Sequence, residues 1–171
     1  MALTKLNSAS VIERLPVGSV IQTYTSKLTN DHTFDQQTMT DIPDMTLTVT
    51  PKSASSKFLI SWHLSWAHNG DNVHIHINLV GGSANLLLSD TADSRRRATM
   101  TLNMSSIVSS MFNTSGVFLD APNTTNAHTY KLQGESSNGQ LWYVNRSGRD
   151  YNGANYDGRG TSTFCVQEIK G

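Results

Sequence analysis

Hydrophobic and polar residues alternate with a period of two along most of this chain. The segment KFLISWHLSW (57–66) and the segment VHIHINLV (73–80) both place Ile, Leu, Val or aromatic residues at every second position. Successive side chains of a β-strand point to opposite faces, so one face of each segment is apolar. The pattern is typical of half-buried strands, and it makes Trp62 and Trp66 core residues.

Similar alternation predicts further strands, which lie at residues 18–25, 45–50, 98–112, 128–133, 140–145 and 161–169. Turn signals rich in Gly, Asn, Ser and Pro separate them, including GGSAN (81–85), NTSG (113–116) and NGANYDGRG (152–160). Many short strands with such punctuation predict an all-β sandwich or barrel. Eight to ten strands in one domain of this size favour a jelly roll.

Residues 1–17 form a separate segment that precedes the first strand. Only LNSASVIERL (6–15) has a helical period, and its apolar residues are too few to build a core of their own. We therefore divide the chain into a docking arm (1–17) and a head domain (18–171). The candidate docking residues are Leu3, Leu6, Val11, Ile12 and Leu15.

Charge and composition exclude several function classes. Lys and Arg together number 13, as do Asp and Glu, so the formal net charge is zero, whereas a nucleic-acid-binding domain normally has a basic excess. No apolar run is long enough for a membrane-spanning helix, and the first residues do not resemble a signal peptide. The lone Cys165 permits no intrachain disulfide. These features predict no nucleic-acid partner and no membrane insertion.

Four blocks of sequence together resemble a known domain. They are RLPVGSVIQTYT (14–25), LTVTPKSASSKFLISW (47–62), LDAPNTTNAHTYKLQ (119–133) and LWYVNRSGRDYNGANYDGRGTSTFCVQEI (141–169). In this order they resemble a domain of marine bacteriophages, cyanophages in particular, found at the ends of tail-fibre-like and other virion-surface proteins. The resemblance extends from about Pro16 to Gly171.

This resemblance implies a jelly roll like the heads of tumour necrosis factor and complement proteins, assembled as a homotrimer. It further implies a virion component, assembled in the host cytoplasm and displayed on the virion surface, where it touches the host cell. Residues 1–17 would dock the head to other virion proteins. Because a short arm rather than a long shaft precedes the head, a capsid or tail decoration protein without receptor binding is the alternative.

The two histidines of VHIHINLV raise the possibility of a metal centre. A cupin, which is a metal-dependent jelly-roll enzyme, needs an acidic ligand four to five residues after the HxH pair, but INLVGGSAN follows His76. A second hypothesis places His74 and His76 of three chains around a metal on a threefold axis. We favour a third interpretation, in which these histidines lie on the outer face of a strand, either solvated or packed between subunits, and we expect no cofactor.

The sequence contains no recognisable nucleophilic site. No G-x-S-x-G elbow occurs, and Cys165 lies within the predicted strand 161–169, where a free cysteine usually behaves as a small apolar residue. We therefore expect a protein that is not an enzyme. A cupin-like enzyme is the alternative from another class.

The strongest binding candidate is the loop NRSGRDYNGANYDGRGTS (145–162). Its combination of Tyr, Gly, Asn and Arg resembles that of evolved recognition loops, in which rigid aromatic area is joined to adaptable hydrogen bonding. Such residues suit a host surface polysaccharide, although the same loop could serve as an ordered connection between strands or subunits. The candidate contact residues are Arg149, Tyr151, Asn152, Asn155, Tyr156 and Arg159.

Two smaller features of the sequence are a short basic run and a tryptophan between two large neighbours. The run Arg95–Arg97 is either a solvated loop balanced by Asp90 and Asp93 or a contact for acidic lipopolysaccharide or another virion protein. Trp142 lies between Leu141 and Tyr143, and this makes it a candidate for a subunit interface.

Overall fold

The chain folds into two antiparallel β-sheets. The computed structural model describes residues 8–70, 73–103, 109–153 and 155–171. Within these residues one short helix, α1 (Ser8–Arg14), precedes the sheets, and none is long and apolar enough to cross a membrane. The strands are β1 (Val20–Leu28), β2 (His32–Phe34), β3 (Thr40–Val49), β4 (Lys57–His68), β5 (Ile75–Gly81), β6 (Ala84–Asn85), β7 (Met100–Leu102), β8 (Phe112–Asp120), β9 (His128–Ser136), β10 (Trp142–Val144) and β11 (Ser162–Ile169).

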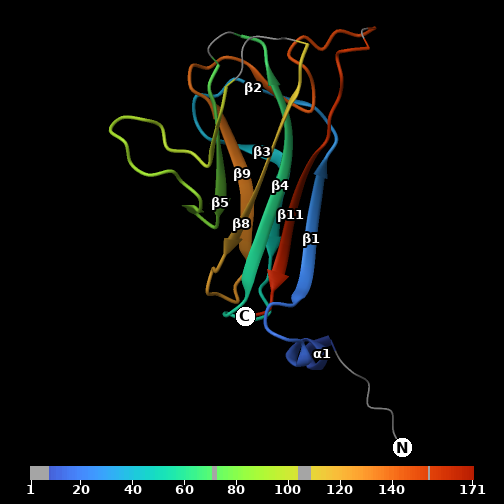
Figure 1. The fold of residues 1–171 in the computed structure, drawn as a ribbon, viewed down its shortest axis with the longest axis vertical. Coiled ribbons are helices and arrows are strands. Elements are labelled where there is room, and N and C mark those ends of the chain that lie inside the picture. Colours follow the sequence, from blue (N-terminus) through green and yellow to red (C-terminus); the bar gives the residue numbers. More distant parts are fainter. Residues whose placement is uncertain (1–7, 71–72, 104–108, 154) are drawn as a thin grey trace, which may run out of the picture.

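The first sheet has the order β1-β11-β4-β10-β2, and β8 pairs with the other edge of β4. The second sheet has the order β3-β9-β5-β6, with β7 also paired to β5. Every pairing is antiparallel, and the strands of both sheets run along the long axis of the molecule (Figure 1). The predicted all-β class is therefore confirmed, and the arrangement fits a β-sandwich.

Side chains from the inner faces of both sheets form one core. Strand β4 contributes the alternating residues that the sequence predicts, and each is at most 4% exposed: Phe58, Ile60, Trp62, Leu64 and Trp66. The Phe58 ring meets Tyr130 of the other sheet at 5.7 Å. Trp142 is fully buried and stacks on Phe34 with ring centroids 4.4 Å apart. Trp142 is thus a core residue, and its assignment to a subunit interface is wrong.

The predicted turn NTSG (113–116) lies instead in the middle of β8. A Cβ atom at Gly116 would lie 2.1 Å from the Trp62 ring, so this glycine is required for close packing. Gly in a strand often marks such an approach rather than a turn. Residues 98–112, expected to be one strand, contribute β7 and the first residue of β8, while residues 104–108 lie outside the described part.

Strand β5 is buried on both faces. Its apolar face lies in the core as predicted, with Ile75, Ile77 and Leu79 fully buried. The opposite face is covered by residues 86–99, which we call the cover segment; the Thr99 hydroxyl accepts a hydrogen bond from the Leu79 amide, and the Thr99 amide donates one to Asn78. The alternation of apolar and polar residues predicted the strand, but it gave no sign that the cover segment buries the second face.

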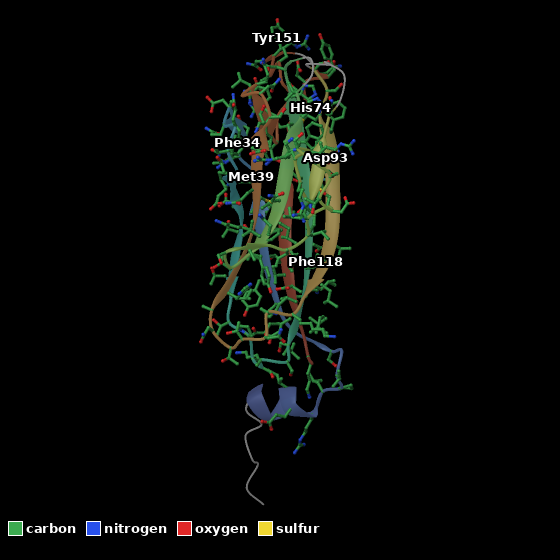
Figure 2. The ribbon with its side chains drawn as sticks, turned by 90° about the vertical axis from the view of Figure 1, so that its left-hand side faces the viewer. Phe34, Met39, His74, Asp93, Phe118 and Tyr151 are labelled. Atoms are coloured by element: carbon green, nitrogen blue, oxygen red, sulfur yellow. The ribbon has the colours of Figure 1, made fainter. Side chains whose placement is uncertain are left out.

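The two ends of the molecule differ in character. Helix α1 and the C-terminus lie at one end, and the loop at residues 145–162 lies at the other (Figure 1). Figure 2 shows Tyr151 at the tip opposite α1. The backbone of Lys170 bonds to Gly18 and Ser19, which extends the β1–β11 ladder to the end next to α1. In addition, the Lys170 ammonium donates to the carbonyl oxygens of Glu13 and Leu15.

Candidate recognition loop

The loop at residues 145–162 is closed at its neck by backbone contacts. The Gly160 amide donates to the Asn145 carbonyl oxygen at 3.0 Å. One residue further into the loop, Arg146 and Arg159 form an isolated antiparallel bridge. The two limbs are thus joined where they leave β10 and return to β11. Such a pinched surface loop can hold its apex in a defined position.

Asn145 joins this neck to the body of the head. The side chain is buried, and its amide nitrogen donates to the carbonyl oxygens of Leu28 and Asn30 at 2.9 and 3.0 Å. Its amide oxygen accepts a 2.7 Å hydrogen bond from the Ser162 hydroxyl. The backbone has a φ of 63°, which Asn tolerates better than other residues with a side chain. Asn145 therefore binds segments from both ends of the chain to the loop.

Three arginines and three aspartates surround this neck. Arg159 pairs with Asp31 at 2.5 Å and with Asp150 at 2.8 Å. Arg146 lies 3.4 Å from Asp31 and 3.5 Å from Asp150, and its guanidinium stacks on the Tyr143 ring at 3.9 Å. Arg146 and Arg159, which stand on opposite limbs of the loop, therefore share the two partners Asp31 and Asp150. Asp31 also joins them to the segment before β2.

Arg149 forms the third pair, with Asp157. Its Nε and Nη2 atoms donate to one carboxylate oxygen of Asp157 at 2.9 and 2.5 Å, and the Ser147 hydroxyl donates to the other at 2.8 Å. Desolvation raises the pKa of Asp157, but the hydrogen bonds from Arg149 and Ser147 outweigh it, so the net pKa lies below the usual value. Asp157 is therefore an anion that fixes the apex.

Two tyrosines stand outward above this pair. Tyr151 and Tyr156 are 60% and 63% exposed, and the Arg149 guanidinium lies 5.7 Å and 4.8 Å from their ring centroids. Aromatic rings this exposed in a charged loop contribute little to packing. They are available to an external ligand.

A pocket lies on each side of the returning limb of the loop. The first has a volume of about 400 Å³ and is lined by Asp150, Tyr151, Asn152, Gly153, Asp157 and Arg159. The second has a volume of about 370 Å³ and is lined by Ser109, Ser110, Met111, Tyr156 and Gly158. Successive residues 156–159 face the two pockets alternately, so this limb forms the ridge between them.

The structure thus places all six candidate residues on one exposed loop but divides them into two groups. Tyr151, Tyr156, Asn152 and Asn155 present exposed side chains, whereas Arg149 and Arg159 are engaged in ion pairs. Sequence reasoning missed the partners Asp31, Asp150 and Asp157, as well as Asn145. Asp150 and Asp157 stand within the loop itself and could have been noticed there. Asp31 gave no local signal, because it precedes the loop by more than a hundred residues.

The His74/His76 face is not arranged as a metal site within one chain. His76 is 7% exposed, and its Nδ1 atom lies 3.3 Å from the Thr101 hydroxyl, while His74 bonds to Asn103. Burial lowers the pKa of His76, and the charge of Arg96 and the neighbouring His74 lower it further. Across the described residues no group of three or more His, Cys, Asp or Glu side chains is placed to hold a metal ion. The threefold-axis hypothesis involves three chains and stays a prediction.

The basic run at Arg95–Arg97 belongs to the cover segment. Arg96 pairs with Glu135, whose side chain is only 3% exposed, and the Arg97 Nε atom donates to the Ser89 carbonyl oxygen. The carboxylate that balances Arg96 is thus Glu135 on β9. The sequence had pointed to Asp90 and Asp93 for this role.

Of the docking candidates, the described residues are Val11, Ile12 and Leu15. Val11 is 44% exposed and Ile12 and Leu15 are partly buried, so the single chain covers this apolar stripe only in part. Leu3 and Leu6 lie outside the described residues.

Comparison with known proteins gives no relative that identifies the chain. No protein-family model matches the sequence, and a search of curated proteins gives no match.

Proposed function

We propose that this protein is a bacteriophage virion-surface protein, in which a homotrimeric jelly-roll head is anchored through residues 1–17 and presents the loop at residues 145–162 to a host surface glycan. The role is structural and binding rather than catalytic. Two considerations support it: the resemblance of the four sequence blocks, and the polarity of the molecule. The single observation that carries it is that α1 and the exposed tyrosines lie at opposite ends (Figures 1 and 2).

The strand order supports the jelly roll. Without the short strands β2, β6 and β10, the sheets have the orders β1-β11-β4-β8 and β3-β9-β5-β7. Numbering these eight strands along the chain gives 1-8-3-6 and 2-7-4-5, in which consecutive strands alternate between the two sheets, except that strands 4 and 5 are neighbours in one sheet. This is the connectivity of two nested Greek keys.

The outer face of the first sheet supports trimer formation. Two rows of paired residues cross the strands β1, β11, β4 and β8 on this face. They are Thr23–Gln167–Leu59–Leu119 and Thr25–Cys165–Ser61–Val117. Neither row contains a charged residue, and Val117 and Leu119 are 61% and 50% exposed. Depletion of charge with exposed apolar side chains is typical of the centre of an interface. We assign this face to contacts between copies of the chain.

The edge strands of the two sheets also support a contact between copies of the chain beside β8. Strand β8 pairs only with β4 within the described part of the chain, and over nine residues it contains no Pro or Lys and a single charge, Asp120. By contrast, β3 is protected by Pro43, by its aspartates and by a register shift between Asp41 and Thr46. Exposed edges normally carry such protection against association. The bare edge of β8 is therefore expected to be covered in the assembly.

The location of the protein in intact particles tests the proposal. Antibody labelling of purified phage would locate the protein in the particle, and a variant that lacks residues 1–17 would test the role of the arm. The truncated protein should fold and form trimers, as measured by light scattering, but should be absent from particles. Trimers that dissociate on truncation, or truncated protein that still enters particles, would contradict the assigned role of the arm.

An adsorption assay separates attachment from decoration. Purified trimer should compete with phage for host cells, and a protein with both tyrosines changed to alanine should not. Failure of the unmodified trimer to compete, together with loss of particle stability in its absence, would instead indicate a decoration protein.

A further inference from the structure

The charges of the recognition loop neutralise one another. Arg146, Arg149 and Arg159 face Asp31, Asp150 and Asp157, so the cluster has three positive and three negative groups. The shorter contacts, between 2.5 and 2.8 Å, hold Arg149 and Arg159 on carboxylates. An arginine recognises an anionic ligand through the same guanidinium edges that these carboxylates occupy.

An acidic ligand would therefore have to displace an existing partner. The carboxylates of Asp150 and Asp157 line the first pocket together with Arg159, so an incoming carboxylate, sulfate or phosphate would also meet negative charge. Nothing in the cluster supplies the excess of positive charge that an anionic polysaccharide requires. This disfavours acidic polymers as ligands of the loop.

The remaining groups suit an uncharged sugar. The Asp150 carboxylate, whose side chain is 32% exposed, accepts hydrogen bonds only, and the amide of Asn152 both donates and accepts, so the pocket matches the hydroxyl groups of a pyranose ring. Tyr151 and Tyr156 offer exposed ring faces beside the two pockets, against which the apolar face of a sugar can pack. Each tyrosine serves a different pocket across the ridge of residues 156–159.

We propose that the loop binds a neutral glycan of at least two pyranose units, with one unit in each pocket and Tyr151 and Tyr156 as the stacking residues. This inference rests on the proposed function and names the ligand class of its site. Arg149 acts as a positioning residue, which holds the apex through Asp157 rather than touching the glycan, whereas Arg159 lines the first pocket with its guanidinium held by Asp31 and Asp150.

Binding of immobilised polysaccharides to the full-length trimer tests the ligand class. The probes are two neutral polymers, mannan and dextran, and two anionic polymers, alginate and polygalacturonate, each at low and high NaCl. We expect binding to a neutral polymer that is unaffected by salt, since no ion pair with the ligand is formed. Tyr151→Ala and Tyr156→Ala should each weaken it about tenfold, near the upper limit for one aromatic contact.

Two control variants separate binding from folding. Tyr151→Phe keeps the ring and should bind nearly as well as the unmodified protein, and Val17→Ala alters a residue that is 76% exposed near α1 and should have no effect. Binding to alginate or polygalacturonate that salt abolishes would overturn the neutral class. Binding to none of the four polymers would overturn it as well.

The adsorption assay distinguishes failure of this inference from failure of the proposed function. Trimer that competes with phage for host cells but binds only anionic polymers, or none, leaves the attachment role in place and refutes the neutral glycan. Trimer that neither competes nor binds refutes both.

Discussion

Replacement of Asn145 provides the sharpest test of how the recognition loop is held. Asn145→Gly removes three hydrogen bonds, to the Leu28 and Asn30 carbonyl oxygens and from the Ser162 hydroxyl, while keeping a residue that accepts a φ of 63°. At about 1 kcal/mol for each hydrogen bond, the free energy of unfolding should fall by about 3 kcal/mol. For a domain of this size, that lowers the melting temperature by about 6–12 °C.

Asn145→Ala removes the same hydrogen bonds and adds backbone strain. A residue with a Cβ atom pays about 1–2 kcal/mol in the left-handed region, so the alanine variant should be less stable than the glycine variant by that amount. Asn145→Asp preserves size and shape but turns a carboxylate towards the carbonyl oxygens of Leu28 and Asn30. We expect it to be at least as destabilising as alanine above the pKa of that carboxyl group.

Urea unfolding followed by tryptophan fluorescence measures these differences, because all three tryptophans are buried in the core. The protein concentration must be the same for every variant, since the stability of an oligomer depends on it. A glycine variant within about 0.5 kcal/mol of the unmodified protein would refute the contribution of the hydrogen bonds. An alanine variant as stable as the glycine variant would refute the strained backbone.

Three further predictions concern the arm, the cover segment and the subunit interface. Lys170→Met removes the ammonium group that bonds the carbonyl oxygens at the end of α1, so amide exchange over residues 8–15 should accelerate while the head keeps its melting temperature; unchanged exchange would contradict the tether. The lowered pKa of His76 means that the unfolded chain binds a proton more readily than the folded one, so the free energy of unfolding should fall as the pH drops below about 6.5, as measured by urea titrations between pH 7 and 5. His76→Gln should reduce this pH dependence, and an unaltered slope would exclude His76 as its origin. Val117→Glu should yield monomers in light scattering, whereas Thr46→Glu on the other sheet should not, and trimers of the Val117 variant would exclude the proposed face.

The strands could be predicted because their alternation is local. Every second residue of β4 from Phe58 to Trp66 is large and apolar, and burial of that face is enough to determine the strand. Gly116 was misread as part of a turn, because the residue that requires a glycine there lies on the neighbouring strand. The Trp62 ring occupies the space that a side chain at position 116 would need. The polar face of β5 was predicted to be an outer face for a similar reason, since the cover segment that buries it follows the strand and does not alter the strand's alternation. A local pattern of hydrophobic and polar residues does not show which distant segment packs against a strand.

The candidate site shows the same division. The composition of the loop predicted a contact surface that includes Tyr151 and Tyr156, and both side chains are exposed, while their role in binding stays a prediction. The role of Arg159 could be predicted only in part, because its partner Asp150 lies in the same loop whereas its other partner, Asp31, precedes the loop by more than a hundred residues. The arginines therefore looked like contact residues, although their present partners make them part of the framework.

The residues that hold the loop in place are different from the residues that it exposes to solvent. Asn145 and the ion pairs of the three arginines lie at the neck and under the apex, where a substitution changes stability. Tyr151 and Tyr156 project beyond this framework, and more than half of each is exposed, so little packing is lost when either is replaced. A change at the apex should therefore cost almost no folding free energy, whereas a change at the neck lowers stability first. Under the proposed function, such a loop could change its ligand while the head beneath it stays the same.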